Sequence, residues 1–241
     1  YYSLETEEDN RKALDYYLQY IEYNPKDTDT LLHIGLIYES GLGVPLNIDL
    51  ARRYYERAAE QDETGMAYNF LGGTYMNDEE TESNERKAVH YFQKAIELGN
   101  TNAMFRISYY LHNGKGGLQV DIPREIELLT EASKRGNHQA TYRLGLLFED
   151  NESGMAQNLE LSVKYFQLAA DNGILAAINK MGELYLFGEV IPANLTKAIS
   201  CFTAASEQGY GKASYWLGRL HTDGIGQLEK DTQKAMNYYR K

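Results

Sequence analysis

Few residues of this chain are spaced for catalysis or metal binding. The single cysteine, Cys201, excludes an internal disulfide and a cysteine-based zinc site, and its apolar neighbours favour a buried thiol. Two glycine clusters, at 41–43 and 114–117, lack the strand context and the Gly-Lys-[Ser/Thr] pattern of a phosphate-binding loop. The histidines lie far apart and form no His-Glu-x-x-His pair; they are His33, His90, His112, His138 and His221. We therefore expect a protein that is not an enzyme and holds no metal or cofactor.

Binding chemistry is offered instead by cations and aromatic residues at a regular interval. Arg106, Arg143 and Lys180 follow one another 37 residues apart, and Trp216 comes 36 residues after Lys180. The flanking positions carry Phe105, Tyr109, Tyr142, Tyr215 and Arg219. Cations bind carboxylate or phosphate, and aromatic rings supply contact area at low entropic cost. The series predicts a surface for an extended peptide with acidic, phosphorylated or carboxyl-terminal groups. The alternative is that the cations pair with neighbouring Asp and Glu while the rings complete packing between repeats.

The same interval governs the whole chain. A small residue recurs at separations of 37, 36, 37, 37 and 36 residues, at Gly35, Gly72, Ser108, Gly145, Gly182 and Gly218. A second series runs in step with it, through Ala58, Ala95, Ala132, Ala169 and Ala205. Two linked series predict one repeated unit stacked into a solenoid. We expect a single domain over 1–241, with a partial repeat at 1–29 and full repeats at about 30–66, 67–102, 103–139, 140–176, 177–212 and 213–241.

Each repeat is predicted to hold two helices. The first has apolar residues at helical spacing, as in 140–148, and the second combines a small residue, two aromatic positions and a small pair, as in 51–59. Counted from the recurring glycine of the first helix, positions −5, −4, −1, 0, +2 and +3 should be buried. Positions −3, −2, +1 and +4 should point outward, toward the concave groove of a solenoid. The cation series occupies position −2.

The final repeat carries the fullest pattern, Ala213-Ser-Tyr-Trp-Leu-Gly218-Arg-Leu-His-Thr-Asp-Gly224-Ile-Gly226 followed by Lys234-Ala235-Met-Asn-Tyr238-Tyr239. It resembles the Sel1-like repeat, a relative of the tetratricopeptide repeat. The resemblance covers about residues 30–241, and residues 10–24 look like the second helix of a preceding repeat. It implies an all-α fold in which two-helix repeats stack into a right-handed superhelix with a concave and a convex face.

The resemblance also implies a function. Members of this family commonly assemble protein complexes, including endoplasmic-reticulum quality-control ligase complexes, chitin-synthase regulation and bacterial proteins acting on host cells. It favours a non-catalytic scaffold or adaptor that binds a protein or peptide. The alternative is a regulatory or substrate-recruiting module of a larger enzyme or ligase complex. Some cysteine-rich bacterial relatives are linked to β-lactam binding, but they carry a cysteine pair in each repeat and this chain has one cysteine in total.

Composition narrows the partners. The chain has 241 residues with a formal net charge of −11, which argues against general binding to nucleic acid or to anionic membranes. No apolar run approaches the roughly 20 residues that cross a bilayer. We expect a soluble protein of the cytoplasm or the secretory lumen, whose partners include proteins, peptides or a second copy of itself. Two N-x-[S/T] sequons, at Asn151 and Asn194, fit a secretory location. The start at Tyr1 and the last helix ending at Lys241 without a cap suggest a segment of a longer protein.

Overall fold

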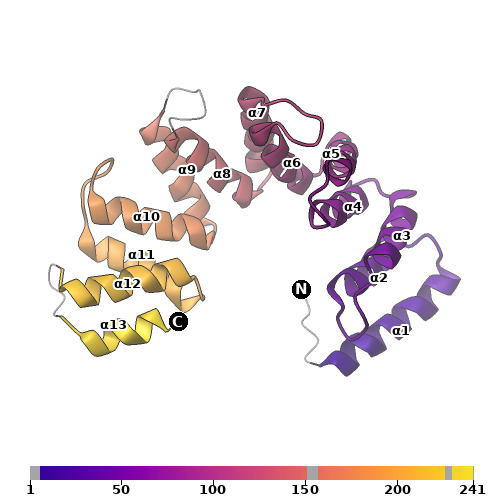
Figure 1. Ribbon diagram of the computed structural model, residues 1–241, viewed down its shortest axis with the longest axis horizontal. Coiled ribbons are helices and arrows are strands. Elements are labelled where there is room, and N and C mark those ends of the chain that lie inside the picture. Colours follow the sequence, from indigo (N-terminus) through magenta and orange to yellow (C-terminus); the bar gives the residue numbers. More distant parts are fainter. Residues whose placement is uncertain (1–5, 151–156, 226–229, 241) are drawn as a thin grey trace. The chain divides into compact units, whose positions relative to one another are not determined.

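The computed structural model describes residues 6–150, 157–225 and 230–240. These described residues form thirteen helices and no strand, so the predicted all-α class is confirmed (Figure 1). The chain divides into two compact units, residues 1–128 and residues 129–241. The Asn151 sequon and Lys241 lie outside the described residues.

The first unit consists of helices packed in sequential pairs. The helices are α1 (Glu7–Tyr23), α2 (Thr28–Ser40), α3 (Ile48–Ala59), α4 (Met66–Met76), α5 (Glu82–Glu97), α6 (Thr101–Asn113) and the first part of α7 (Ile122–Lys134). Helix α2 packs on α3, and α4 packs on α5, as the two helices of one repeat should. Helix α1 packs on α2, as the second helix of a preceding repeat would.

The second unit repeats this arrangement. After the end of α7 come α8 (His138–Glu149), α9 (Leu159–Asp171), α10 (Leu175–Phe187), α11 (Leu195–Glu207), α12 (Gly211–Asp223) and α13 (Thr232–Tyr239). Helix α10 packs both on α11, its partner within the repeat, and on α9 of the preceding repeat. Helices α2, α4, α10 and α12 are each held between two second helices, which is how a solenoid buries a continuous core.

Local signals in the sequence set the helix ends. Asn47, Asn137 and Asn194 cap α3, α8 and α11, and each side chain accepts a backbone N–H from the first turn. A glycine with positive φ follows the second helix in four repeats, at Gly99, Gly136, Gly173 and Gly209. Asp62 stands where the first repeat lacks that glycine, and its carboxylate accepts the backbone N–H of Ala67 at 2.7 Å. The carboxylate therefore helps to begin α4.

The recurring glycine makes room for an aromatic ring. A Cβ atom at Gly145 would lie 2.6 Å from the ring of Phe166, a residue of the second helix in the same repeat. Gly72 and Phe92 have the same relationship in the first unit. The third repeat carries Ser108 in place of the glycine, and the residue that corresponds to the aromatic is Leu129. Glycine therefore recurs where the facing residue of the second helix is an aromatic ring, because only glycine lets the ring come this close to the helix backbone.

Candidate interaction surface

The outward side of the first helices follows the predicted pattern. In α12, Leu217 and Leu220 are buried, whereas the side chain of Tyr215 is 50% exposed. In α8, Leu144 is buried and Arg143 is half-buried. Position −3 holds exceptions, because Leu32, Asn69 and Asn179 were predicted to point outward but are buried; Asn179 of α10 is only 3% exposed. Its amide donates a hydrogen bond to Glu183 at 2.9 Å, which holds it against its own helix.

Position −2 contacts the aromatic ring of the preceding repeat. In the first unit, the ring of Phe70 stacks on Tyr55 with centroids 5.3 Å apart, and Arg106 places its guanidinium carbon 6.0 Å from the ring centroid of Phe92. Arginine can replace an aromatic ring here because the face of an aromatic ring attracts a cation. The predicted site residue Arg106 is thus part of the joint between two repeats.

The second unit has the same joints. The Lys180 ammonium lies 5.7 Å from the ring centroid of Phe166, and Trp216 stacks on Phe202 with centroids 5.9 Å apart. These contacts match the alternative in which the long side chains and rings complete packing between repeats. Lys180 and Trp216 therefore have a structural role in the joints between repeats.

Lys180 also has carboxylate partners. Its ammonium lies 2.8 Å from Glu149 at the end of α8 and 3.9 Å from Glu183 of its own helix. Glu183 in turn accepts a hydrogen bond from the Trp216 indole nitrogen at 3.0 Å. This network joins the first helices of three successive repeats. Because two glutamates surround one lysine, the site is not a simple positive patch.

Tyr142 lies close to this network and is half-buried. Its ring is tilted against Phe166, with centroids 5.6 Å apart. Burial, followed by the nearby Tyr210, Glu183 and Glu149, raises the pKa of the Tyr142 phenol to about 12. Tyr142 therefore stays neutral and can donate a hydrogen bond throughout the physiological range.

The most accessible part of this surface lies on α12. Tyr215 and Arg219 are about half exposed, and the guanidinium carbon of Arg219 lies 5.4 Å from the ring centroid of Trp216. Arg219 reaches Asp223 only at 3.9 Å. Phe187, which is 57% exposed, packs edge-on against Trp216. An arginine beside exposed rings is the chemistry that was predicted for partner binding.

The remaining predicted residues belong to the first unit. Phe105 and Arg106 are half-buried, and Tyr109 is 40% exposed with the Lys115 ammonium 5.5 Å from its ring centroid. The structure therefore brings Tyr142, Lys180, Tyr215, Trp216 and Arg219 together within the second unit. It describes Phe105, Arg106 and Tyr109 as a separate group.

Comparison with known proteins matches this arrangement to a family. The Sel1 repeat family model matches residues 1–19, 29–63, 65–100, 101–137, 138–174, 175–210 and 211–241. The chain belongs to the Sel1 repeat family. The predicted resemblance is confirmed, and Sel1 repeat proteins are typically non-catalytic scaffolds for protein–protein interaction.

Curated Sel1 repeat relatives match parts of the chain. It is 41% identical over 75 residues to Protein sel-1 homolog 2 of Rattus norvegicus, covering 31% of this chain and 11% of that protein. It is 33% identical over 78 residues to the Sel1-repeat-containing protein YjcO of Escherichia coli strain K12, covering 32% of this chain and 34% of that protein. The matched segment is thus only a small part of the sel-1 homolog 2 protein.

Solved Sel1 repeat structures share the fold. The crystal structure of a Sel1 repeat protein from Oxalobacter formigenes has a TM-score of 0.77 at 24% identity, covering 89% of this chain and 84% of that one. The immunity protein Pa5087 from Pseudomonas aeruginosa has a TM-score of 0.58 at 21% identity, covering 88% and 80%. At these identities the likeness establishes the α-solenoid fold alone.

Sequence reasoning offered pairing of the cations with Asp and Glu as the alternative, but it did not name the carboxylates that pair with Lys180 on this Sel1 repeat surface. Glu149 lies at +4 and Glu183 at +1, both outward positions, and Glu183 follows Lys180 by one helical turn. That spacing is a usable signal for the pair within α10. The approach of Glu149 from another repeat could be found only once the stacking of α8 and α10 was known.

Other chemistry of this Sel1 repeat chain is limited where the structure describes it. Within the described ranges, no group of three or more His, Cys, Asp or Glu side chains could hold a metal ion. Burial raises the pKa of the Cys201 thiol. His112 lies 2.9 Å from the buried carboxylate of Glu125. None of the helices described is both long enough and apolar enough to cross a bilayer.

Proposed function

We propose that this chain is a non-catalytic adaptor that holds a segment of a partner protein against the outward side of its first helices. The observation that carries the proposal is the group formed by Tyr215, Trp216 and Arg219 on α12. It combines half-exposed aromatic surface with a guanidinium whose described carboxylate partner is 3.9 Å away. Tyrosine, tryptophan and arginine are the residues that most often dominate binding energy at protein interfaces.

The partner segment is proposed to carry a carboxylate or phosphate group. Arg219 is the cation to which this group would bind, because its guanidinium is about half exposed and presents several donors to an anion. Lys180 contributes less, since Glu149 and Glu183 already surround its ammonium. The anionic group is therefore expected near α12, and the rest of the segment along α10.

A comparison of captured proteins tests this function. Wild type, a Tyr215→Ser/Arg219→Glu variant and a Lys134→Glu control are immobilised and exposed to an extract of the native source. Bound proteins are then quantified by mass spectrometry. Lys134 is an exposed cation of α7, so the control makes the same type of charge change elsewhere. We expect specific partners to be lost from the double variant and retained by the control.

Circular dichroism of all three proteins must first show equal helical content. Unchanged partners on an equally helical double variant would overturn the proposed surface. Loss from both variants would indicate a general charge effect instead of a site on α12.

A further inference from the structure

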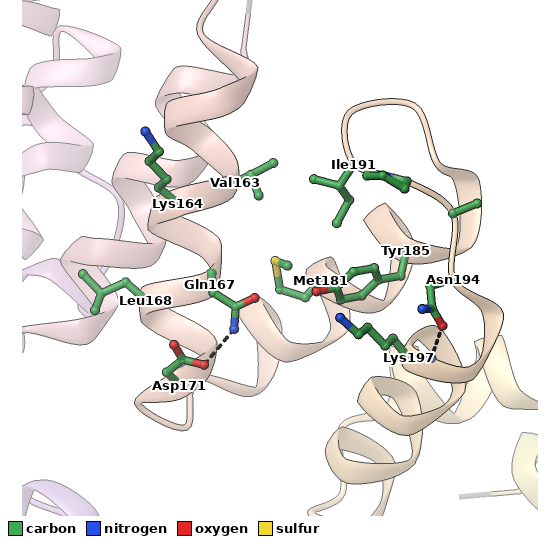
Figure 2. Close-up of a pocket in the computed structure, with 12 residues that line it drawn as sticks. Val163, Lys164, Gln167, Leu168, Asp171, Met181, Tyr185, Ile191, Asn194 and Lys197 are labelled. Atoms are coloured by element: carbon green, nitrogen blue, oxygen red, sulfur yellow. Dashed lines mark hydrogen bonds between the residues drawn. The ribbon is translucent and has the colours of Figure 1, made fainter.

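A groove of about 640 Å³ lies on the other side of the second unit, among α9, α10 and α11. Figure 2 shows Val163 of α9 and Ile191 of the α10–α11 loop on opposite sides of it, with Met181 and Tyr185 of α10 between them. Most of the lining is apolar, and Pro192 and Ala193 continue the wall that the loop forms. The groove separates the second helices of two successive repeats and lies apart from the surface on α12.

The corresponding place in the first unit is narrowed by an arginine, and the pocket of about 430 Å³ that remains there is lined mostly by charged residues. Arg52 holds the repeat position of Val163, and Tyr75 holds that of Tyr185. The Arg52 guanidinium carbon lies 4.0 Å from the ring centroid of Tyr75. The same guanidinium donates hydrogen bonds to the Thr74 hydroxyl at 3.1 Å and to Asp78 at 2.7 Å. A side chain of the protein itself therefore takes up part of this space between α3 and α5.

A loop covers another equivalent position. Val89 of α5 is only 4% exposed, and a Cβ atom at Gly116 would lie 2.6 Å from its side chain, so the loop after α6 packs directly on it. Val163 differs from both residues. Its side chain is too short to reach across the space as Arg52 does, and the loop that carries Ile191 lies on the opposite side of the groove. The second unit thus has a larger and more apolar groove at the position where the first unit has a smaller pocket lined mostly by charged residues.

The two lysines of the groove have no carboxylate partner among the described residues, whereas its aspartate is hydrogen-bonded. The Lys197 ammonium lies 5.2 Å from the ring centroid of Tyr185 and pairs with no carboxylate among the described residues. Lys164 on the rim is exposed and likewise pairs with no described carboxylate. Asp171, at the end away from Ile191 in Figure 2, accepts a hydrogen bond from Gln167 at 2.7 Å. In a chain of net charge −11, this is a locally positive groove with an apolar floor.

We propose that this groove is a second docking site, which binds a partner's peptide segment through an apolar side chain that is flanked by carboxylates. The apolar side chain lies between Val163 and Ile191, over Met181 and Tyr185, where burial of apolar area stabilises the complex. A flanking carboxylate pairs with the Lys197 ammonium, whose described surroundings supply an aromatic ring but no anion. Arg52 provides an internal comparison, because it shows that a side chain inserted at this position can stack on the tyrosine of the next first helix.

Short peptides can test the chemistry directly. Acetyl-Asp-Leu-Asp-amide, acetyl-Asp-Ser-Asp-amide and acetyl-Lys-Leu-Lys-amide are titrated into the isotope-labelled full chain, and amide chemical shifts are followed by NMR. We expect saturable shifts at Val163, Tyr185 and Lys197 with the first peptide and at least about tenfold weaker binding of the other two. A Lys197→Glu variant should lose the preference for acidic over basic flanks.

Two matched variants locate the binding. Val163→Arg places in α9 the residue that the first repeat already carries, so it should fold, narrow the groove and make its lining polar. Leu159→Arg adds the same charge at the start of the same helix, at a residue that does not line the groove. We expect Val163→Arg to weaken the acidic leucine peptide by about tenfold or more and Leu159→Arg to leave it unchanged.

Several results would overturn the proposal. These are equal binding of the serine peptide, unchanged binding to Val163→Arg, shifts confined to residues outside the groove, or no saturable binding of any peptide. The Tyr215→Ser/Arg219→Glu variant should bind the leucine peptide like wild type. That control separates a failure here from a failure of the surface on α12.

Discussion

A Cβ atom on residue 182 would lie 2.6 Å from the Phe202 ring, so the backbone of α10 and this ring are in direct contact. Gly182→Ala should therefore destabilise the protein by about 2 kcal/mol, because overpacking outweighs the better helix propensity of alanine. Urea unfolding followed by circular dichroism measures this change.

The third repeat suggests a second substitution that should relieve the clash, since it carries Ser108 and Leu129 at the two corresponding positions. Gly182→Ser combined with Phe202→Leu should be more stable than the sum of the single effects predicts, and strict additivity would contradict the proposed clash.

The fluorescence of Trp216 should reveal changes in the hydrogen-bond network around Glu183. Trp216 is the single tryptophan of the chain, and its indole nitrogen donates to Glu183 at 3.0 Å. Glu183→Ala should cost about 1–3 kcal/mol, since hydrogen bonds to a charged group are lost. It should also increase quenching of the tryptophan by acrylamide. Glu183→Gln keeps an acceptor oxygen and should stay close to wild type. Glu207→Ala, an exposed carboxylate of α11, serves as the control and should change neither signal.

Acid should weaken the first unit partly through Asp78. Its hydrogen bond from Arg52 holds the pKa of the Asp78 carboxyl below its usual value. A depressed folded pKa contributes stability that is present above the unfolded value, about 3.9, and that is lost as the pH falls through the folded pKa. Asp78→Asn should therefore lower stability at pH 6 and show a shallower loss than wild type between about pH 4 and pH 2. The check is the urea midpoint measured at each pH, and parallel curves for the two proteins would contradict this role.

Alkali should act on the second unit through Tyr142. The pKa of its phenol is raised to about 12, first by burial, whereas an unfolded tyrosine ionises near 10. A raised folded pKa gives stability that is complete below about pH 10 and is lost as the pH rises toward 12. Tyr142→Phe should lose less stability than wild type between these values. Carbon NMR of labelled tyrosine measures the pKa directly, and a value near 10 in the folded protein would remove the basis for this prediction.

Much of the fold could be predicted because two series of small residues, one of glycines and one of alanines, recur at the same interval. The register places Leu144 and Leu217 inside and Tyr215 and Arg219 outside, and the structure agrees. The contacts between position −2 and the aromatic rings could not be predicted from the sequence pattern alone. They require knowing that a first helix packs on the second helix of the preceding repeat.

The surface was harder to predict than the fold. Lys180 was assigned to a positive series, but Glu149 approaches it from another repeat, at 2.8 Å. The size and the apolar lining of the groove beside Val163 depend on what is absent there, namely a long polar side chain such as Arg52 or a loop such as the one at Gly116. A sequence pattern marks which residues point outward, but the neighbours that satisfy or cover them come from elements distant in the chain.

The stacking of position −2 on the preceding repeat has a consequence for how such a chain can change in evolution. Tandem duplication or loss of one period of 36 or 37 residues creates one new junction between repeats. At that junction, the ring of a second helix meets the residue at position −2 of a different repeat. Loss of one period between α9 and α12 would bring Trp216 over Phe166, where an ammonium now lies. The new junction would still be sound, because the face of an aromatic ring accepts either a second ring or a cation. The array can therefore lengthen or shorten by recombination without a matching mutation at the seam.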